Sequence, residues 1–149
     1  MDANHKLCAQ TSDSDLLLQN PEYYRRLVGK LIYLTVIRPD ISFAVGIISR
    51  YMHSPRRSHL QAVARILRYL KTAPGQGLVY KSSSSAPTLV AYSDADYVVS
   101  LDDRWSTNGF CTYFGGHLIT WRSKKQVVVA RSSAEAEYRA MASMVSELT

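Results

Sequence analysis

The chain has 149 residues, of which 46% are hydrophobic and 20% are charged, and these values are ordinary for a globular protein with one domain, or one and a half small ones. No apolar run is long enough to span a membrane, and the N-terminus has neither the apolar core of a signal peptide nor the acid-poor composition of a transit peptide. We therefore expect no membrane span and a cytoplasmic or nuclear location. Two isolated cysteines do not suggest a disulfide framework.

The net charge of +6 is concentrated in one segment of the chain. Residues 21–72 contain ten Lys and Arg against two acidic residues, whereas residues 73–149 contain seven of each sign. A basic segment of this kind can attract nucleic acid, or it can be a set of solvated helix faces.

The N-terminal half begins with a polar stretch, residues 1–20, which we expect to be a flexible tail. Asn20 and Pro21 are typical of a helix N-cap and a first helical position. Apolar residues then recur at helical spacing until Pro39 interrupts the pattern. The sequence therefore predicts a first helix that begins at Pro21.

Two further helices are expected before residue 76. Asp40 is placed to cap one of them, with an apolar stripe that reaches Met52, and Pro55 is placed to open the other. Three arginines lie together on one face of the last of these helices, and we take them as candidates for binding nucleic acid: Arg57, Arg65 and Arg68.

The break PGQG at 74–77 is followed by a change of periodicity to two, which indicates strands. Strands are expected at 78–81, 88–95, 108–114 and 117–123, and the last two form a hairpin around Gly115-Gly116. The run QVVVA at 126–130 predicts a further strand or a continuation of that hairpin.

The C-terminal stretch predicts one more helix, which starts with a capping box formed by Ser132 and Glu135. We expect its buried face to carry an apolar stripe composed of Tyr138, Met141, Ala142, Val145 and Leu148. The capping box gives Glu135 a structural role.

Two other acidic residues lack such a role. Glu137 borders the apolar stripe of this helix, and Asp94 shares one strand face with Val90 and Tyr92. If the helix packs on that face, the two carboxylates converge and require a cation, for which oxygen ligands favour Mg²⁺ or Mn²⁺. Spacing alone favours a chance arrangement of the two acids, or a link to Lys124 or Arg131, over a metal site.

Five sequence runs together resemble the polyproteins of copia-type retrotransposons, most closely those of plants. Two of them resemble the end of the reverse transcriptase, namely YRRLVGKLIYLTVIRPDISFAV at 24–45 and RRSHLQAVARILRYLKTAPGQGLVY at 56–80. Three resemble the start of the RNase H domain, namely YSDADY at 92–97, STNGFCTYFGGHLITWRSKKQ at 106–126 and RSSAEAEYRA at 131–140.

This resemblance implies an α+β fold in two parts. Residues 21–76 would be a basic helical segment from the tail of the reverse transcriptase. Residues 77–149 would be a truncated RNase H-like domain, in which one helix packs on a mixed sheet.

The resemblance also implies a two-metal site that cleaves RNA in RNA–DNA hybrids. Asp94 and Glu137 match the first two catalytic carboxylates of the family, and these are the two metal ligands that we expect. The family's third and fourth acids have no counterpart before Thr149, so we expect a vestigial site with no firm cofactor, and Mg²⁺ or Mn²⁺ only if the site is completed. Lys124 and Lys125 either contact a phosphate backbone or form a charged hairpin end.

Three functions therefore remain open from the sequence. The one we favour is a truncated or domesticated retrotransposon fragment, non-catalytic, that acts through contacts with a cellular protein or through self-assembly. The alternatives are a metal-dependent RNase H and a non-catalytic module that binds an RNA–DNA hybrid or another nucleic acid. We expect the strand of Asp94 to have an open edge that pairs with a second copy, with residues 78–81 as a rival cover for that edge.

Overall fold

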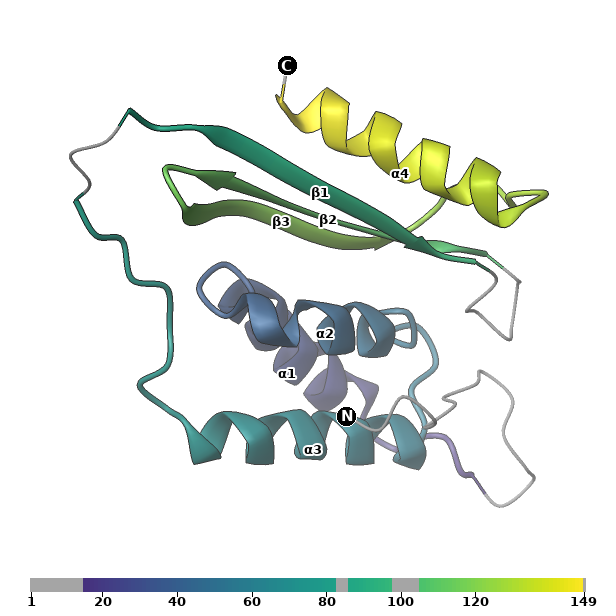
Figure 1. Ribbon diagram of the computed structural model, residues 1–149. Coiled ribbons are helices and arrows are strands. Elements are labelled where there is room, and N and C mark those ends of the chain that lie inside the picture. The colour runs from purple at the N-terminus through teal and green to yellow at the C-terminus, as the bar shows by residue number, and fades with distance from the viewer. Residues whose placement is uncertain (1–14, 83–85, 98–104, 149) are drawn as a thin grey trace. The chain divides into compact units, whose positions relative to one another are not determined.

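The computed structural model describes residues 15–82, 86–97 and 105–148. The chain divides into two compact units, Met1–Gly77 and Leu78–Thr149. The first unit contains the helices α1 (Pro21–Leu34), α2 (Ser42–Ser49) and α3 (Arg57–Thr72), with a short 3-10 helix η1 (Pro39–Ile41). The second contains the strands β1 (Leu89–Asp96), β2 (Thr107–Phe114) and β3 (His117–Lys125) and the helix α4 (Ser133–Leu148). Across these residues the fold is α+β (Figure 1).

The first unit is held by an apolar core shared among its helices. α1 begins where the sequence predicts, because the side chain of Asn20 accepts a hydrogen bond of 3.1 Å from the backbone of Tyr23 and Pro21 lies in the first turn. The buried apolar residues of the core are Tyr24, Val28, Leu31, Ile41, Val45, Ile48, Ala62, Val63 and Ile66. The phenol of Tyr24 donates a 2.6 Å hydrogen bond to the carbonyl of Ile48, which ties α1 to α2.

The predicted cap at Asp40 is wrong, because its carboxylate is used elsewhere. Arg38 is buried and donates two hydrogen bonds to Asp40, at 2.9 and 2.7 Å. The Arg38 guanidinium therefore lowers the pKa of the Asp40 carboxyl, and the hydroxyl of Tyr69 on α3 adds a third hydrogen bond at 2.8 Å. Asp40 consequently joins η1 to α3, and the predicted single helix begins as η1 and continues as α2.

Residues 1–14 of the predicted tail lie outside the described residues, but the segment that follows them is attached to the start of α3. The carboxylate of Asp15 accepts hydrogen bonds from the backbone and the hydroxyl of Ser58, at 3.1 and 2.6 Å. The backbone of Leu18 donates to the carbonyl of Pro55 at 3.0 Å. Asp15 and Leu18 are therefore hydrogen-bonded to residues at the start of α3 and just before it.

The second unit is an antiparallel sheet in the order β1-β2-β3, with α4 along one face (Figure 1). The predicted hairpin is confirmed, since Gly115 and Gly116 both have positive φ, at +58° and +80°, as a two-residue turn between right-twisted strands requires. Among the described residues, β1 pairs only with β2.

Two predicted strands are absent from the described residues of this unit. Residues 78–81 are irregular, and Tyr80 instead donates a 2.9 Å hydrogen bond to the carbonyl of Leu118 at the start of β3. Residues 126–130 leave the sheet to reach α4, so their β-rich composition does not make a strand.

The packing face of α4 also differs from the prediction. The residues buried against the sheet are the small Ala136 and Ala140, and α4 contacts both β1 and β2. Small side chains let a helix approach a sheet closely, whereas the predicted apolar stripe remains at the surface. Its large members are exposed, with Tyr138 at 70%, Met141 at 47%, Val145 at 53% and Leu148 at 41%.

No helix in the described part of the chain combines the length and the apolar character that crossing a membrane requires.

Candidate nucleic-acid interface

The position of Asp94 follows from the register of β1. Ser93 lies opposite Phe110 on β2, and Phe110 is buried and lines a cleft with residues of α4. Directly paired residues of antiparallel strands share one face, so Ser93 faces α4 and its neighbour Asp94 points to the opposite face. Asp94 is exposed, and its carboxylate accepts a 2.8 Å hydrogen bond from the backbone of Ala95.

Glu137 lies on the exposed surface of α4, between the buried Ala136 and the exposed Tyr138. No hydrogen bond or ion pair joins it to Asp94 among the described residues, and α4 packs on the face that Asp94 does not share. Within the described ranges, no three His, Cys, Asp or Glu side chains are grouped so that they could hold a metal ion. The register of β1 and the packing of α4 therefore do not bring the two predicted ligands together, and their role as metal ligands stays a prediction.

The predicted lysines Lys124 and Lys125, in contrast, border a cleft between the end of β3 and α4. Arg122 on β3 and Arg139 on α4 border the same cleft, which has a volume of about 310 Å³. Side chains of Phe110 and Ala142 contribute apolar lining. Neither arginine is among the residues predicted from the sequence, although Arg122 stands two residues before Lys124 and period two places them on the same strand face.

The cleft has more positive than negative charge. Glu147 lies 3.4 Å from Arg122, and Glu135 lies 2.8 Å from Arg139. The ammonium group of Lys125 lies 4.7 Å from the centre of the Trp105 ring, a cation–π contact that leaves its charge in place. Lys124 is exposed and forms no ion pair with a described residue. Lys124 is therefore the cation of this cleft whose charge has no carboxylate partner among the described residues.

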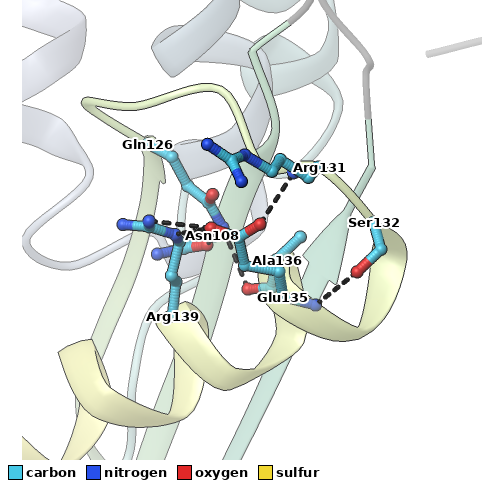
Figure 2. A network of polar contacts seen from close by, with 7 residues as sticks. All are labelled: Asn108, Gln126, Arg131, Ser132, Glu135, Ala136 and Arg139. Carbon is cyan, nitrogen blue, oxygen red and sulfur yellow. Dashed lines mark hydrogen bonds and ion pairs between the residues drawn. The ribbon is translucent and has the colours of Figure 1, made fainter.

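Glu135 fixes the first turn of α4 beside this cleft (Figure 2). Its backbone donates a 3.1 Å hydrogen bond to the hydroxyl of Ser132, which confirms that half of the predicted capping box. Its carboxylate accepts from the backbone of Arg131 at 2.8 Å and from the side chain of Arg139 at 2.8 and 3.1 Å. The hydrogen bond from Arg131, followed by that from Arg139, lowers the pKa of the Glu135 carboxyl.

Gln126 connects the sheet to α4 (Figure 2), and it is one of the residues that line the cleft. Its backbone donates to the carbonyl of Ser106 at 2.9 Å. Its side-chain nitrogen donates to the side-chain oxygen of Asn108 and, at 2.9 Å, to the carbonyl of Ala136. The residue is 5% exposed, and its side-chain oxygen has no hydrogen-bond partner among the described residues.

The other predicted cations lie in the first unit. Arg57, Arg65 and Arg68 are all exposed on α3 and form no ion pair with a described residue. They form a basic stripe along α3.

Comparison with known proteins supplies the family. No family model and no solved structure matches the chain. The Retrovirus-related Pol polyprotein from transposon RE1 of Arabidopsis thaliana is 51% identical over 131 residues, and that from transposon RE2 of the same plant is 49% identical over 138 residues. These matches cover 88% and 93% of this chain but 9% of each polyprotein.

A shorter relative has nearly the same extent as this chain. The protein named Secreted RxLR effector protein 161 of Plasmopara viticola is 42% identical over 125 residues, which are 83% of this chain and 87% of that protein. The class that these similarities define is the retrovirus-related Pol polyproteins of transposons. Within that class, the chain belongs to the copia-type family found in plants.

Proposed function

We propose that the chain binds the sugar-phosphate backbone of nucleic acid, and that its ligand class is the RNA–DNA hybrid produced during reverse transcription. The observation that carries the proposal is the cleft bordered by Arg122, Lys124, Lys125 and Arg139, in which four cations gather and Lys124 is exposed without an ion pair to a described residue. Phosphate binding by such a cluster gains free energy from the release of counterions. Membership of a retrotransposon Pol family supports the same ligand class.

The domain assignment that accompanies this proposal rests on the matched motifs. We assign residues 21–76 to the tail of a reverse transcriptase and residues 77–149 to an RNase H-like domain. In this assignment the cleft belongs to the RNase H-like part, together with Asp94 and Glu137 as the family's first two carboxylates.

A titration with matched variants tests the proposal. We measure binding by fluorescence anisotropy with a labelled 12-base-pair hybrid at salt concentrations from about 50 to 200 mM. The affinity should fall steeply as the salt concentration rises, because each phosphate contact releases counterions. A triple replacement by alanine of Arg122, Lys124 and Lys125 should weaken binding and flatten the salt dependence.

The matched control removes the same charge elsewhere, by replacing Arg57, Arg65 and Arg68 of α3 with alanine. This second variant should keep most of the affinity. If the α3 variant alone loses binding, the interface lies on α3. If the unaltered protein does not bind the hybrid at low salt, the proposed function is wrong.

A second candidate function, self-association, is favoured by the edge of β1. This strand has no partner on its outer side among the described residues, and its Tyr92 is 62% exposed. Open strand edges recruit other strands, most simply a second copy about a two-fold axis. Residues 78–81 do not cover this edge of β1, because Tyr80 and Lys81 form hydrogen bonds with Leu118 and His117 of β3 instead.

Light scattering across a concentration series separates this candidate from a monomeric protein. Self-association predicts a mass that rises toward twice the monomer value, and Tyr92→Lys should shift that transition to higher concentration. A constant monomer mass at high concentration would remove the candidate.

A further inference from the structure

The flank of α4 that faces the open edge of β1 is apolar. Arg139 and Ala142 line the cleft together with residues of β3, so they mark the flank of α4 toward that strand. At about 100° per residue, the side chains of Met141, Met144 and Leu148 lie on the opposite flank of the helix, toward β1. Met141 and Leu148 are 47% and 41% exposed, and Met144 is half-buried. An apolar helix flank therefore lies beside a strand whose outer side has no partner among the described residues.

The position of α4 over the sheet suits a pair of helices across this edge. α4 contacts both β1 and β2, and it contacts β1 more extensively (Figure 1). A two-fold axis normal to the sheet, just outside β1, would place two copies of α4 antiparallel on one face of a continuous sheet. Because neighbouring strands are about 4.8 Å apart, two helices that each lie above the line between β1 and β2 would be about 10 Å apart. Helices pack against each other at about 8 to 10 Å, so the two flanks would meet.

The charges on β1 select the register of such a strand pair. Asp94 and Asp96 point to the face opposite α4, together with Tyr92. In a pair centred on Asp94 or Ala95, an aspartate of one copy would lie directly opposite an aspartate of the other, which is destabilising. A pair centred on Tyr92 places Asp94 opposite Val90 of the second copy and brings the two Tyr92 rings together. Aromatic pairs of this kind stabilise antiparallel strands, so the register centred on Tyr92 is favoured.

We propose that the open edge of β1 is an interface for a second copy of this chain, formed by two antiparallel β1 strands centred on Tyr92 and by the two α4 flanks that carry Met141, Met144 and Leu148. This inference rests on self-association, the second candidate function above, and deepens it by identifying the register and the helix face that take part. On the second unit, this interface and the basic cleft occupy opposite flanks of α4, so the two surfaces do not overlap.

Cysteine cross-linking tests the register. Cys8 and Cys111 are first replaced by serine, because Cys111 lies opposite Tyr92 on β2 and would compete. In this background Tyr92→Cys places two Cα atoms about 4.5 to 5.5 Å apart across the two-fold axis, a distance that a disulfide spans. Mild oxidation should therefore give a covalent dimer on a non-reducing gel. The matched control is Asp94→Cys, whose two Cα atoms would be about 14 Å apart along the strands and should not be bridged.

A charge on the helix flank tests the contribution of α4. Met141→Glu would place carboxylates in the apolar contact between the helices, and it should move the monomer–dimer transition in light scattering to about tenfold higher concentration or more. Ser146→Glu is the matched control, because it adds the same charge on the cleft flank of α4, and it should leave the transition unchanged. Both positions are exposed, and circular dichroism checks that each variant folds.

The outcomes separate this inference from the candidate on which it rests. A dimer whose transition does not respond to Met141→Glu, or cross-linking at Asp94→Cys rather than at Tyr92→Cys, would overturn the inference and leave self-association standing. A constant monomer mass of the unaltered protein at high concentration would remove both. Neither result bears on the binding of nucleic acid in the cleft.

Discussion

Tyr24 shows at the scale of one residue how the first unit combines apolar burial with a satisfied polar group. The ring is fully buried, its hydroxyl donates at 2.6 Å to the carbonyl of Ile48, and burial raises the pKa of the phenol. The Ile48 carbonyl also accepts from the backbone of Tyr51, so it keeps one partner when the phenol is removed.

Tyr24→Phe should therefore lower the free energy of unfolding by about 1 kcal/mol, the net value of one hydrogen bond, without creating a cavity. Urea unfolding followed by circular dichroism measures the change. Tyr23→Phe is the matched control, because Tyr23 is exposed and its hydroxyl makes no hydrogen bond with a described residue, and its change should be close to zero. Equal effects of the two variants would contradict this account of the core.

Gln126 is a second example at the scale of one residue, and its contacts between the sheet and α4 could not be predicted from the sequence. It stands in a β-rich run, QVVVA, that predicts a strand. Its actual partners, Asn108 and Ala136, come from a strand and a helix, and only the folded chain brings these positions together. Period two did predict correctly that Asp94 and Tyr92 share a strand face, but it does not specify which face a helix will cover.

At the scale of elements, α4 shows which features of a helix can be predicted from the sequence and which cannot. The helix, its starting region and the Ser132 cap were predictable because they depend on neighbouring residues. The buried face of α4 was not predictable, because helical periodicity identifies two faces and does not determine which of them packs on the sheet. In the structure Ala136 and Ala140 are buried against the sheet, because their small side chains allow close approach, and the larger stripe that contains Tyr138 is exposed.

The first turn of α4 also gives a dependence on pH. Glu135 has a lowered pKa in the folded protein, so its contribution to stability is fully present above its ordinary pKa of 4.5 and is lost as the pH falls through the folded value. The difference in melting temperature between the unaltered protein and Glu135→Gln should be constant near neutral pH and should shrink below about pH 4.5.

The same comparison with Glu137→Gln is the control, because Glu137 accepts no hydrogen bond from a described residue. At neutral pH the melting temperature of this variant should be close to that of the unaltered protein. A Glu135→Gln difference that persists unchanged at acidic pH would show that the carboxylate charge does not hold this turn.

At the scale of the whole molecule, the two units differ in charge and in the function that each supports. The net charge of +6 comes from the helical segment, as the sequence indicates. The cations that border the cleft described above, however, belong to the second unit, Leu78–Thr149, which has seven Lys and Arg and seven acidic residues and is neutral overall. Net charge per segment therefore identifies an attraction for polyanions but not the place where a ligand binds.

The prediction about catalysis also concerns the whole chain. Because Asp94 and Glu137 are not brought together and two carboxylates are too few to hold two cations, the protein alone should not cleave an RNA–DNA hybrid in Mg²⁺ or Mn²⁺. Gel analysis of a labelled hybrid measures this. Cleavage that disappears in both Asp94→Asn and Glu137→Gln would show that the site is completed and that the protein is an RNase H.

The most direct test of the central claim is to locate the bound nucleic acid on the protein. A titration of ¹⁵N-labelled protein with the 12-base-pair hybrid, followed by NMR, reports each backbone amide separately. Our account predicts shifts at Arg122, Lys124, Gln126 and Arg139, with the amides of α3 unchanged. Shifts confined to α3 around Arg65, or no shifts at low salt, would contradict it.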